Sequence, residues 1–196
     1  GYRTTLFRAG GFSIQDFDYV NCFKKYGIVG DSSVLPGSKV RHKTHSYNYL
    51  KVPHNVYRFS EQIDKTSSDG NFWEFPICFG ESVNIAMYLF VKKHWMAKTT
   101  KNWGDGGNRP YICLKDKIKA FIHSFKLFKN THGSIDYQSY FWLRDVYMHS
   151  KKYDCMTIIG HPKNLSSSSL SYLEDFINER LTDGDCLVTM SEYLQN

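Results

Sequence analysis

The chain has 196 residues, of which 41% are hydrophobic and 22% are charged, and this excludes a disordered chain because enough apolar side chains are present for one core. Its formal net charge of +6 comes from scattered lysines without a nucleic-acid-binding motif, so we expect a solvated basic surface. Five widely spaced cysteines without a CxxC pair argue against a disulfide framework and a structural zinc site, and no apolar run reaches the roughly 18 residues of a membrane-spanning helix.

The first predicted elements alternate between strand and helix. They are, in order, a strand over residues 4–8, a helix from Ser13 to Gly27 and a strand over residues 28–29. Gly10 and Gly11 follow the first strand and allow a sharp turn that leaves room for a ligand. Ser13 is a predicted helix N-cap, and Gly27 is a predicted C-terminal stop. A strand–helix–strand unit is typical of an α/β fold with a parallel sheet.

The middle of the chain is predicted to be rich in loops. In order we expect a loop over residues 36–70, a strand over 72–77, a helix over 85–95, a Gly-rich loop over 102–110 and a helix over 118–128. The last of these rests on apolar residues at helical spacing. The two ends of the 36–70 region carry Pro and Gly residues that favour turns.

The final third is predicted to return to alternating elements. We expect a helix over residues 139–148, a buried strand over 156–159, a helix over 170–177 and a last strand over 187–190. The serine run at 166–169 is interpreted as the entry to the third of these. Reduced, mostly buried thiols fit the cysteine pattern best, and this favours a cytoplasmic location. No signal peptide is visible in the sequence.

Three polar residues stand at predicted strand ends, where parallel α/β folds place their ligands. They are Arg8, Asp31 and His161. His161 is a candidate proton shuttle, Asp31 would fix its tautomer, and Arg8 would hold another carboxylate. The alternatives are a structural histidine, a turn cap at Asp31 and a salt-bridge partner at Arg8.

A second candidate feature is the pair Trp73 and Glu74 at the end of a predicted strand. A sugar ring stacks on an aromatic face and donates hydrogen bonds to a carboxylate, so the pair is a candidate sugar-binding element. The alternative is an edge strand with an exposed glutamate. His42 and His45 have ligand-like spacing but lack a nearby carboxylate, and we interpret them as surface residues.

Three segments resemble motifs of NodB-type polysaccharide deacetylases, in the capsule and lipopolysaccharide branch of this carbohydrate esterase family 4-like group. The sequence FRAGGF at 7–12 is similar to the third motif, DSSVLPG at 31–37 to the fourth, and IGHPK at 159–163 to the fifth. Each motif is moderately specific alone, and their order and spacing extend the resemblance over most of the chain. The resemblance implies one domain over residues 1–196 with a partial or distorted (β/α) barrel.

The resemblance also implies residue roles. Arg8 would orient an aspartate base, Asp31 would support His161 as general acid, and Ile159 would line the acetyl pocket beside Gly10 and Gly11. The family uses a divalent metal, typically zinc, to activate water and polarise the acetyl carbonyl. Its base and metal ligands belong to two motifs upstream of the arginine, and only seven residues precede Arg8 here, so we expect no metal ligand in this chain.

The expected function is therefore removal of N- or O-acetyl groups from a polysaccharide or its lipid-linked precursor, with a carbohydrate as partner and activity dependent on the upstream motifs. A non-catalytic glycan-binding or scaffold protein that kept the fold is the alternative. A nucleic-acid binder is a third hypothesis, favoured only by the net charge of +6.

Overall fold

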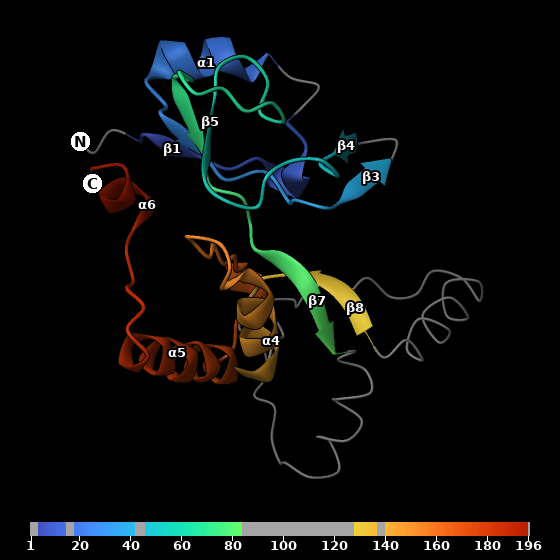
Figure 1. The fold of residues 1–196 in the computed structure, drawn as a ribbon, viewed down its shortest axis with the longest axis vertical. Coiled ribbons are helices and arrows are strands. Elements are labelled where there is room, and N and C mark those ends of the chain that lie inside the picture. Colours follow the sequence, from blue (N-terminus) through green and yellow to red (C-terminus); the bar gives the residue numbers. More distant parts are fainter. Residues whose placement is uncertain (1–3, 15–17, 42–45, 84–127, 137–139, 196) are drawn as a thin grey trace. The chain divides into compact units, whose positions relative to one another are not determined.

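A computed structural model describes residues 4–14, 18–41, 46–83, 128–136 and 140–195 of the chain (Figure 1). These residues form a mixed α/β structure with small sheets, in which barrel closure stays a prediction. They divide into two compact units, built from Gly1–Phe79, Ser150–Thr157 and Val188–Asn196, and from Gly80–His149 and Ile158–Leu187. The expectation of a single domain likewise stays a prediction.

The sheet of the first unit has four short strands in the order β1 (Leu6–Phe7), β2 (Gly30–Asp31), β6 (Phe72–Glu74) and β5 (Tyr57–Phe59). The first three are parallel, as predicted, although the second strand lies at Gly30–Asp31 and not at residues 28–29. Strand β5 is antiparallel to β6. The backbones of β5 and the turn before β6 pass closely, since a Cβ atom on Gly70 would lie 2.6 Å from the backbone nitrogen of Phe59. Glycine is therefore the residue that this turn accommodates.

The prediction of a loop over residues 36–70 is wrong at three short strands and agrees with the structure over the other described residues of this region. Besides β5, this region contains the antiparallel pair β3 (Lys39–Arg41) and β4 (Ser46–Asn48). Each of these strands has only three residues, which is too short to show the alternation of apolar and polar residues that identifies a strand.

Helix α1 (Tyr19–Tyr26) packs on the sheet and closes the core of the first unit (Figure 1). Its side chains Tyr19 and Phe23 are buried against aromatic rings of β5 and β6. The predicted stop is confirmed, because Gly27 adopts φ 68° and its N–H donates to the Phe23 carbonyl. The predicted N-cap is wrong: the helix follows Asp18, and the Ser13 hydroxyl donates to the Ser46 carbonyl instead.

Strand β7 (Phe79–Val83) pairs with β8 (Phe128–His132) in a separate two-stranded sheet. Phe128 thus begins a strand, although the sequence pattern placed it at the end of a helix. The predicted helix over residues 85–95, the Gly-rich loop over 102–110 and the rest of the predicted helix over 118–128 lie outside the described residues.

Two helices, α4 (Tyr140–Ser150) and α5 (Ser167–Thr182), follow, and both confirm helices predicted from the sequence. The serine run is the helix entry, as expected, because the Ser166 hydroxyl accepts a hydrogen bond from the Ser169 N–H at 3.2 Å. The predicted strand over 156–159 is reduced to two isolated parallel bridges, Ile77 with Thr157 and Ser134 with Ile159.

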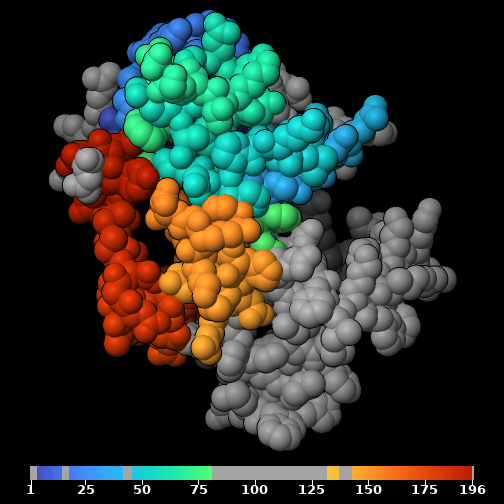
Figure 2. Space-filling model, viewed as in Figure 1, coloured from blue at the N-terminus to red at the C-terminus, as the bar shows by residue number. Residues whose placement is uncertain are grey.

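The predicted last strand over residues 187–190 is wrong. Leu187 is 69% exposed. It belongs to the segment between α5 and α6, and this segment lies at the surface in Figure 2. Thr189 then starts helix α6 (Met190–Tyr193) through a capping box with Glu192. Local hydrogen bonds of this kind outweigh a preference for strand where no neighbouring strand supplies a ladder. No helix within the described ranges is both long and apolar enough to cross a bilayer.

Candidate functional site

Arg8 lies directly after β1 and anchors its guanidinium on the loop that follows β2. Its Nε donates to the Ser32 carbonyl at 2.9 Å, and its Nη2 donates to the Ser32 hydroxyl at 2.6 Å. Partial burial lowers the pKa of Arg8, and the nearby carboxyls of Asp31 and Glu74 oppose this shift. Two hydrogen bonds to Ser32 therefore fix the position of the Arg8 guanidinium. The expected hydrogen bonding of Arg8 to another carboxylate stays a prediction.

Asp31 ends β2 and is fully buried. Its Oδ1 accepts hydrogen bonds from the Ser32 N–H at 2.7 Å and from the Ser33 hydroxyl at 2.5 Å, so it caps the turn that follows. Burial raises the pKa of Asp31 to about 7, although these hydrogen bonds and Arg8 favour the ionised form. The turn-cap alternative is thus the arrangement that the structure has.

Glu74 lies on β6 as the register partner of Asp31 and has no exposed surface. Its Oε1 accepts a hydrogen bond from the Val34 N–H at 2.9 Å. Burial, and then the charge of Asp31, raise the pKa of Glu74 well above its usual range. The alternative of an exposed glutamate on an edge strand is wrong, because β6 lies between β2 and β5.

The expected joint role of Trp73 and Glu74 in sugar binding does not fit their geometry. Successive residues of a strand point to opposite faces of the sheet, so one sugar cannot contact both. Glu74 is buried, whereas Trp73 is half-buried and the guanidinium of Arg58 lies 5.3 Å from its ring. A sugar-binding role for Trp73 alone stays a prediction.

His161 belongs to the second unit, where Asp136 holds it. The parallel bridge between Ser134 and Ile159 aligns the two backbones, and Asp136 and His161 each stand two residues further on. Asp136 Oδ1 accepts the His161 backbone N–H at 2.7 Å, and its Oδ2 accepts a hydrogen bond from His161 Nδ1. The carboxylate that fixes the imidazole is therefore Asp136, not Asp31 as expected.

This pairing sets what the imidazole can do. An ionised carboxylate only accepts hydrogen bonds, so Nδ1 carries the hydrogen and Nε2 is left as the nitrogen that exchanges protons. The side chain of His161 is 55% exposed and that of Asp136 only 11%, so the orienting group is buried and the imidazole is accessible. Such an arrangement suits general acid–base chemistry.

Asp136 was missed in the sequence because nothing around it marks a strand. The segment GSID at 133–136 has no alternating apolar pattern, and one isolated bridge at Ser134 sets its register. The one available signal is the position of an acidic residue shortly before helix α4, which is too common to identify a partner for His161.

The remaining candidate residues differ in accessibility. Gly10 and Gly11 are exposed, a Cβ atom at either position would meet nothing within 4 Å, and Gly11 adopts φ 66°. Ile159 is only 5% exposed and donates its N–H to the Gly133 carbonyl. Their expected substrate contacts stay predictions. His42 and His45 lie outside the described residues.

A divalent metal needs a cluster of donor side chains. Among the described residues, no group of three or more His, Cys, Asp or Glu side chains is placed to hold one. The described part of the chain therefore does not fit the metal that the resemblance implies, and a metal cofactor stays a prediction.

Comparison with known proteins finds no relative for this chain: no family model matches it, and neither a curated protein nor a solved structure is significantly similar. The deacetylase resemblance therefore rests on the sequence motifs at 7–12, 31–37 and 159–163.

Proposed function

We propose that this chain is part of a deacetylase that removes acetyl groups from a polysaccharide or its precursor, with His161 as the general acid and Asp136 as its positioning residue. The observation that carries the proposal is the accessible imidazole whose Nδ1 donates to a buried carboxylate. It supports the role that the motif resemblance implies for this histidine.

The chemistry asks for a proton donor of this kind. Cleavage of an N-acetyl group breaks the bond between the acyl carbon and the nitrogen, and the departing amine takes up a proton. A protonated His161 donates this proton from Nε2, and the Asp136 carboxylate stabilises the imidazolium before transfer. A positioned acid of this type contributes roughly 10²–10⁴-fold to the rate.

Arg8 supplies a second supporting feature in the first unit. Its guanidinium is fixed by two hydrogen bonds to Ser32, and the exposed Gly10 and Gly11 follow it closely along the chain. A fixed cation beside a backbone without Cβ atoms is suited to holding a carboxylate or a substrate oxygen. This supports the role of a positioning arginine.

The test is acetate release from acetylated chitooligosaccharide by the full-length protein supplied with Zn²⁺. We expect His161→Ala to lower the rate by about 10²–10⁴-fold. The control is His149→Ala, since His149 is exposed and bonds only to the Asp145 carbonyl within its own helix among the contacts seen. Equal rates for wild type and His161→Ala would refute the role of His161.

Absence of acetate release by the wild type, together with retention on a chitooligosaccharide resin, would favour the glycan-binding alternative.

A further inference from the structure

Two buried carboxyl groups lie side by side in the sheet of the first unit. Asp31 and Glu74 are register partners on the parallel strands β2 and β6, so their side chains leave the same face of the sheet about 4.8 Å apart at the backbone. Both residues have 0% exposed surface. Asp31 Oδ2 and Glu74 Oε2 are buried oxygens without a hydrogen-bond partner among the described residues.

The groups around this pair do not supply enough positive charge for two carboxylates. The titratable side chains that act on it are Arg8 after β1, Tyr19 of α1, Tyr49 after β4 and Tyr57 of β5. The tyrosines are neutral, since burial raises the pKa of Tyr19 to about 12 and those of Tyr49 and Tyr57 further. One guanidinium therefore faces two carboxyls.

A single proton makes this cluster neutral. Two carboxylates with one guanidinium leave a net negative charge in the interior, which is unfavourable because water does not solvate it. Protonation of one carboxyl removes that charge and turns one of the two unpartnered oxygens into an O–H donor. Buried pairs of acids commonly share a proton for this reason.

The hydrogen bonds indicate which carboxyl is ionised. Asp31 Oδ1 accepts from both the Ser32 N–H and the Ser33 hydroxyl, and two donors favour the carboxylate form. The donors to Glu74 are the backbone N–H groups of Val34 and Ser33, whereas Asp31 has the Ser33 hydroxyl as a side-chain donor as well, and the burial of Glu74 is complete. The proton is therefore assigned to Glu74.

We propose that Asp31 and Glu74 form an acid–carboxylate pair that holds one proton at neutral pH, on Glu74, and that this proton maintains the turn on which Arg8 is anchored. The turn is tied to the pair at Val34 through Glu74 and at Ser32 and Ser33 through Asp31. Ser32 in turn binds Arg8, and the Ser33 hydroxyl accepts from the Ala9 N–H at 2.7 Å. Loss of the proton places a second negative charge beside Asp31, and the repulsion between the two carboxylates weakens the hydrogen bonds that hold the turn and Arg8. The proposal does not depend on deacetylase activity.

Infrared spectroscopy tests the proton directly. A protonated carboxylic acid has a carbonyl stretch that is separate from the carboxylate bands, and we expect this band in the wild-type protein at neutral pH. Glu74→Gln replaces the neutral acid by an amide of the same shape and removes the band, whereas Glu61→Gln, at an exposed glutamate, leaves it in place. Absence of the band in the wild type, or its persistence in Glu74→Gln, would overturn the proposal.

Thermal unfolding as a function of pH gives a second measurement. A carboxyl whose pKa is raised by folding adds stability below its unfolded pKa, here 4.5, and this stability is lost as the pH rises towards the folded pKa. We expect the Tm of the wild type to fall as the pH rises above about 5, and the Tm of Glu74→Gln to fall less steeply. Parallel pH profiles for the two proteins contradict the proposal. If Glu74→Gln does not fold, the wild-type infrared band alone decides.

Discussion

At the scale of single residues, Asp136 binds His161 through both carboxylate oxygens. One oxygen accepts from the backbone N–H and the other from Nδ1 of the ring. The backbone bond fixes the loop position, and the ring bond fixes the tautomer. One buried side chain thus controls both where the imidazole is and which of its nitrogens is reactive.

Replacement of Asp136 by Asn tests this control without relying on turnover. The Asn carbonyl oxygen can still accept the His161 N–H, but its amide group donates towards Nδ1 and so favours the opposite tautomer. We expect ¹⁵N chemical shifts of neutral His161 to report Nδ1–H in the wild type and Nε2–H in Asp136→Asn. An unchanged tautomer in the variant would show that Asp136 does not set it.

The sequence predicted Arg8 and Asp31 as site residues because both stand at the ends of parallel strands. Arg8 follows β1 and Asp31 ends the adjacent parallel strand β2, and the carboxyl ends of such strands meet at one edge of the sheet. Glu74 was recognised as a strand residue, but its buried pairing depends on strand order, which local patterns do not encode. The position of Asp136 beside His161 is set by a single bridge between segments about 25 residues apart, so this contact is determined by the tertiary structure and not by a local pattern.

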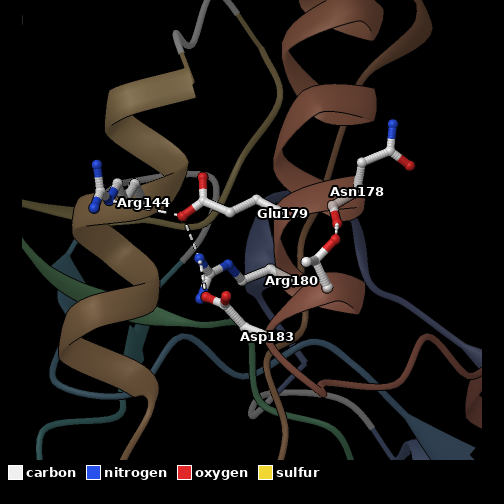
Figure 3. Close-up of polar contacts among 6 residues, drawn as sticks. Arg144, Asn178, Glu179, Arg180 and Asp183 are labelled. Atoms are coloured by element: carbon white, nitrogen blue, oxygen red, sulfur yellow. Dashed lines mark hydrogen bonds and ion pairs between the residues drawn. The ribbon is translucent and has the colours of Figure 1, made fainter.

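At the scale of elements, helices α4 and α5 are joined through Arg180. Figure 3 shows its guanidinium between Glu179 and Asp183, with the Asp183 carboxylate 2.8 Å away. The guanidinium also lies 4.4 Å from the ring centre of Tyr147 on α4, and the side chain is 14% exposed. Arg144 of α4 is 53% exposed and reaches Glu179 only at 4.0 Å.

These two arginines form a matched pair for mutation. We expect Arg180→Ala to lower the free energy of unfolding by about 1–2 kcal/mol, because it removes a stacked, largely buried cation and its aliphatic stem. Arg144→Ala should change it by less than about 0.5 kcal/mol, since exposed ion pairs contribute little. Chemical denaturation of both variants measures the difference. Equal losses would show that stacking on Tyr147 is not what stabilises this helix pair.

The elements that the sequence predicted well are those with strong local signals. Helix α5 has a serine cap and apolar residues at helical spacing, and α1 ends at a glycine with positive φ. Strands β3, β4 and β5 have three residues each and form only through their partners. The β-prone side chains at residues 187–190 have no partner strand among the described residues, and a capping box starts α6 there instead.

At the scale of the whole molecule, the net charge of +6 should produce weak, non-specific attraction to polyanions. We expect the protein to bind a DNA resin at low ionic strength and to elute below about 0.15 M salt, because scattered lysines do not follow a phosphate backbone. Elution from the resin over a salt gradient measures this. Retention well above that salt concentration would favour the nucleic-acid hypothesis instead.

Both compact units are assembled from separated parts of the chain. The first unit combines Gly1–Phe79 with Ser150–Thr157 and Val188–Asn196, and the second takes the two stretches between them. No single cut of the chain therefore yields either unit with all of its parts.

The contact between Tyr193 of α6 and Phe75 has a consequence for biosynthesis. The two rings lie 5.5 Å apart, and Phe75, which directly follows β6, is 1% exposed. While the nascent chain is still on the ribosome, Phe75 emerges more than one hundred residues before the ring that packs on it. This contact therefore forms only after α6 has left the exit tunnel, and until then we expect the Phe75 ring to be less well covered than in the folded protein.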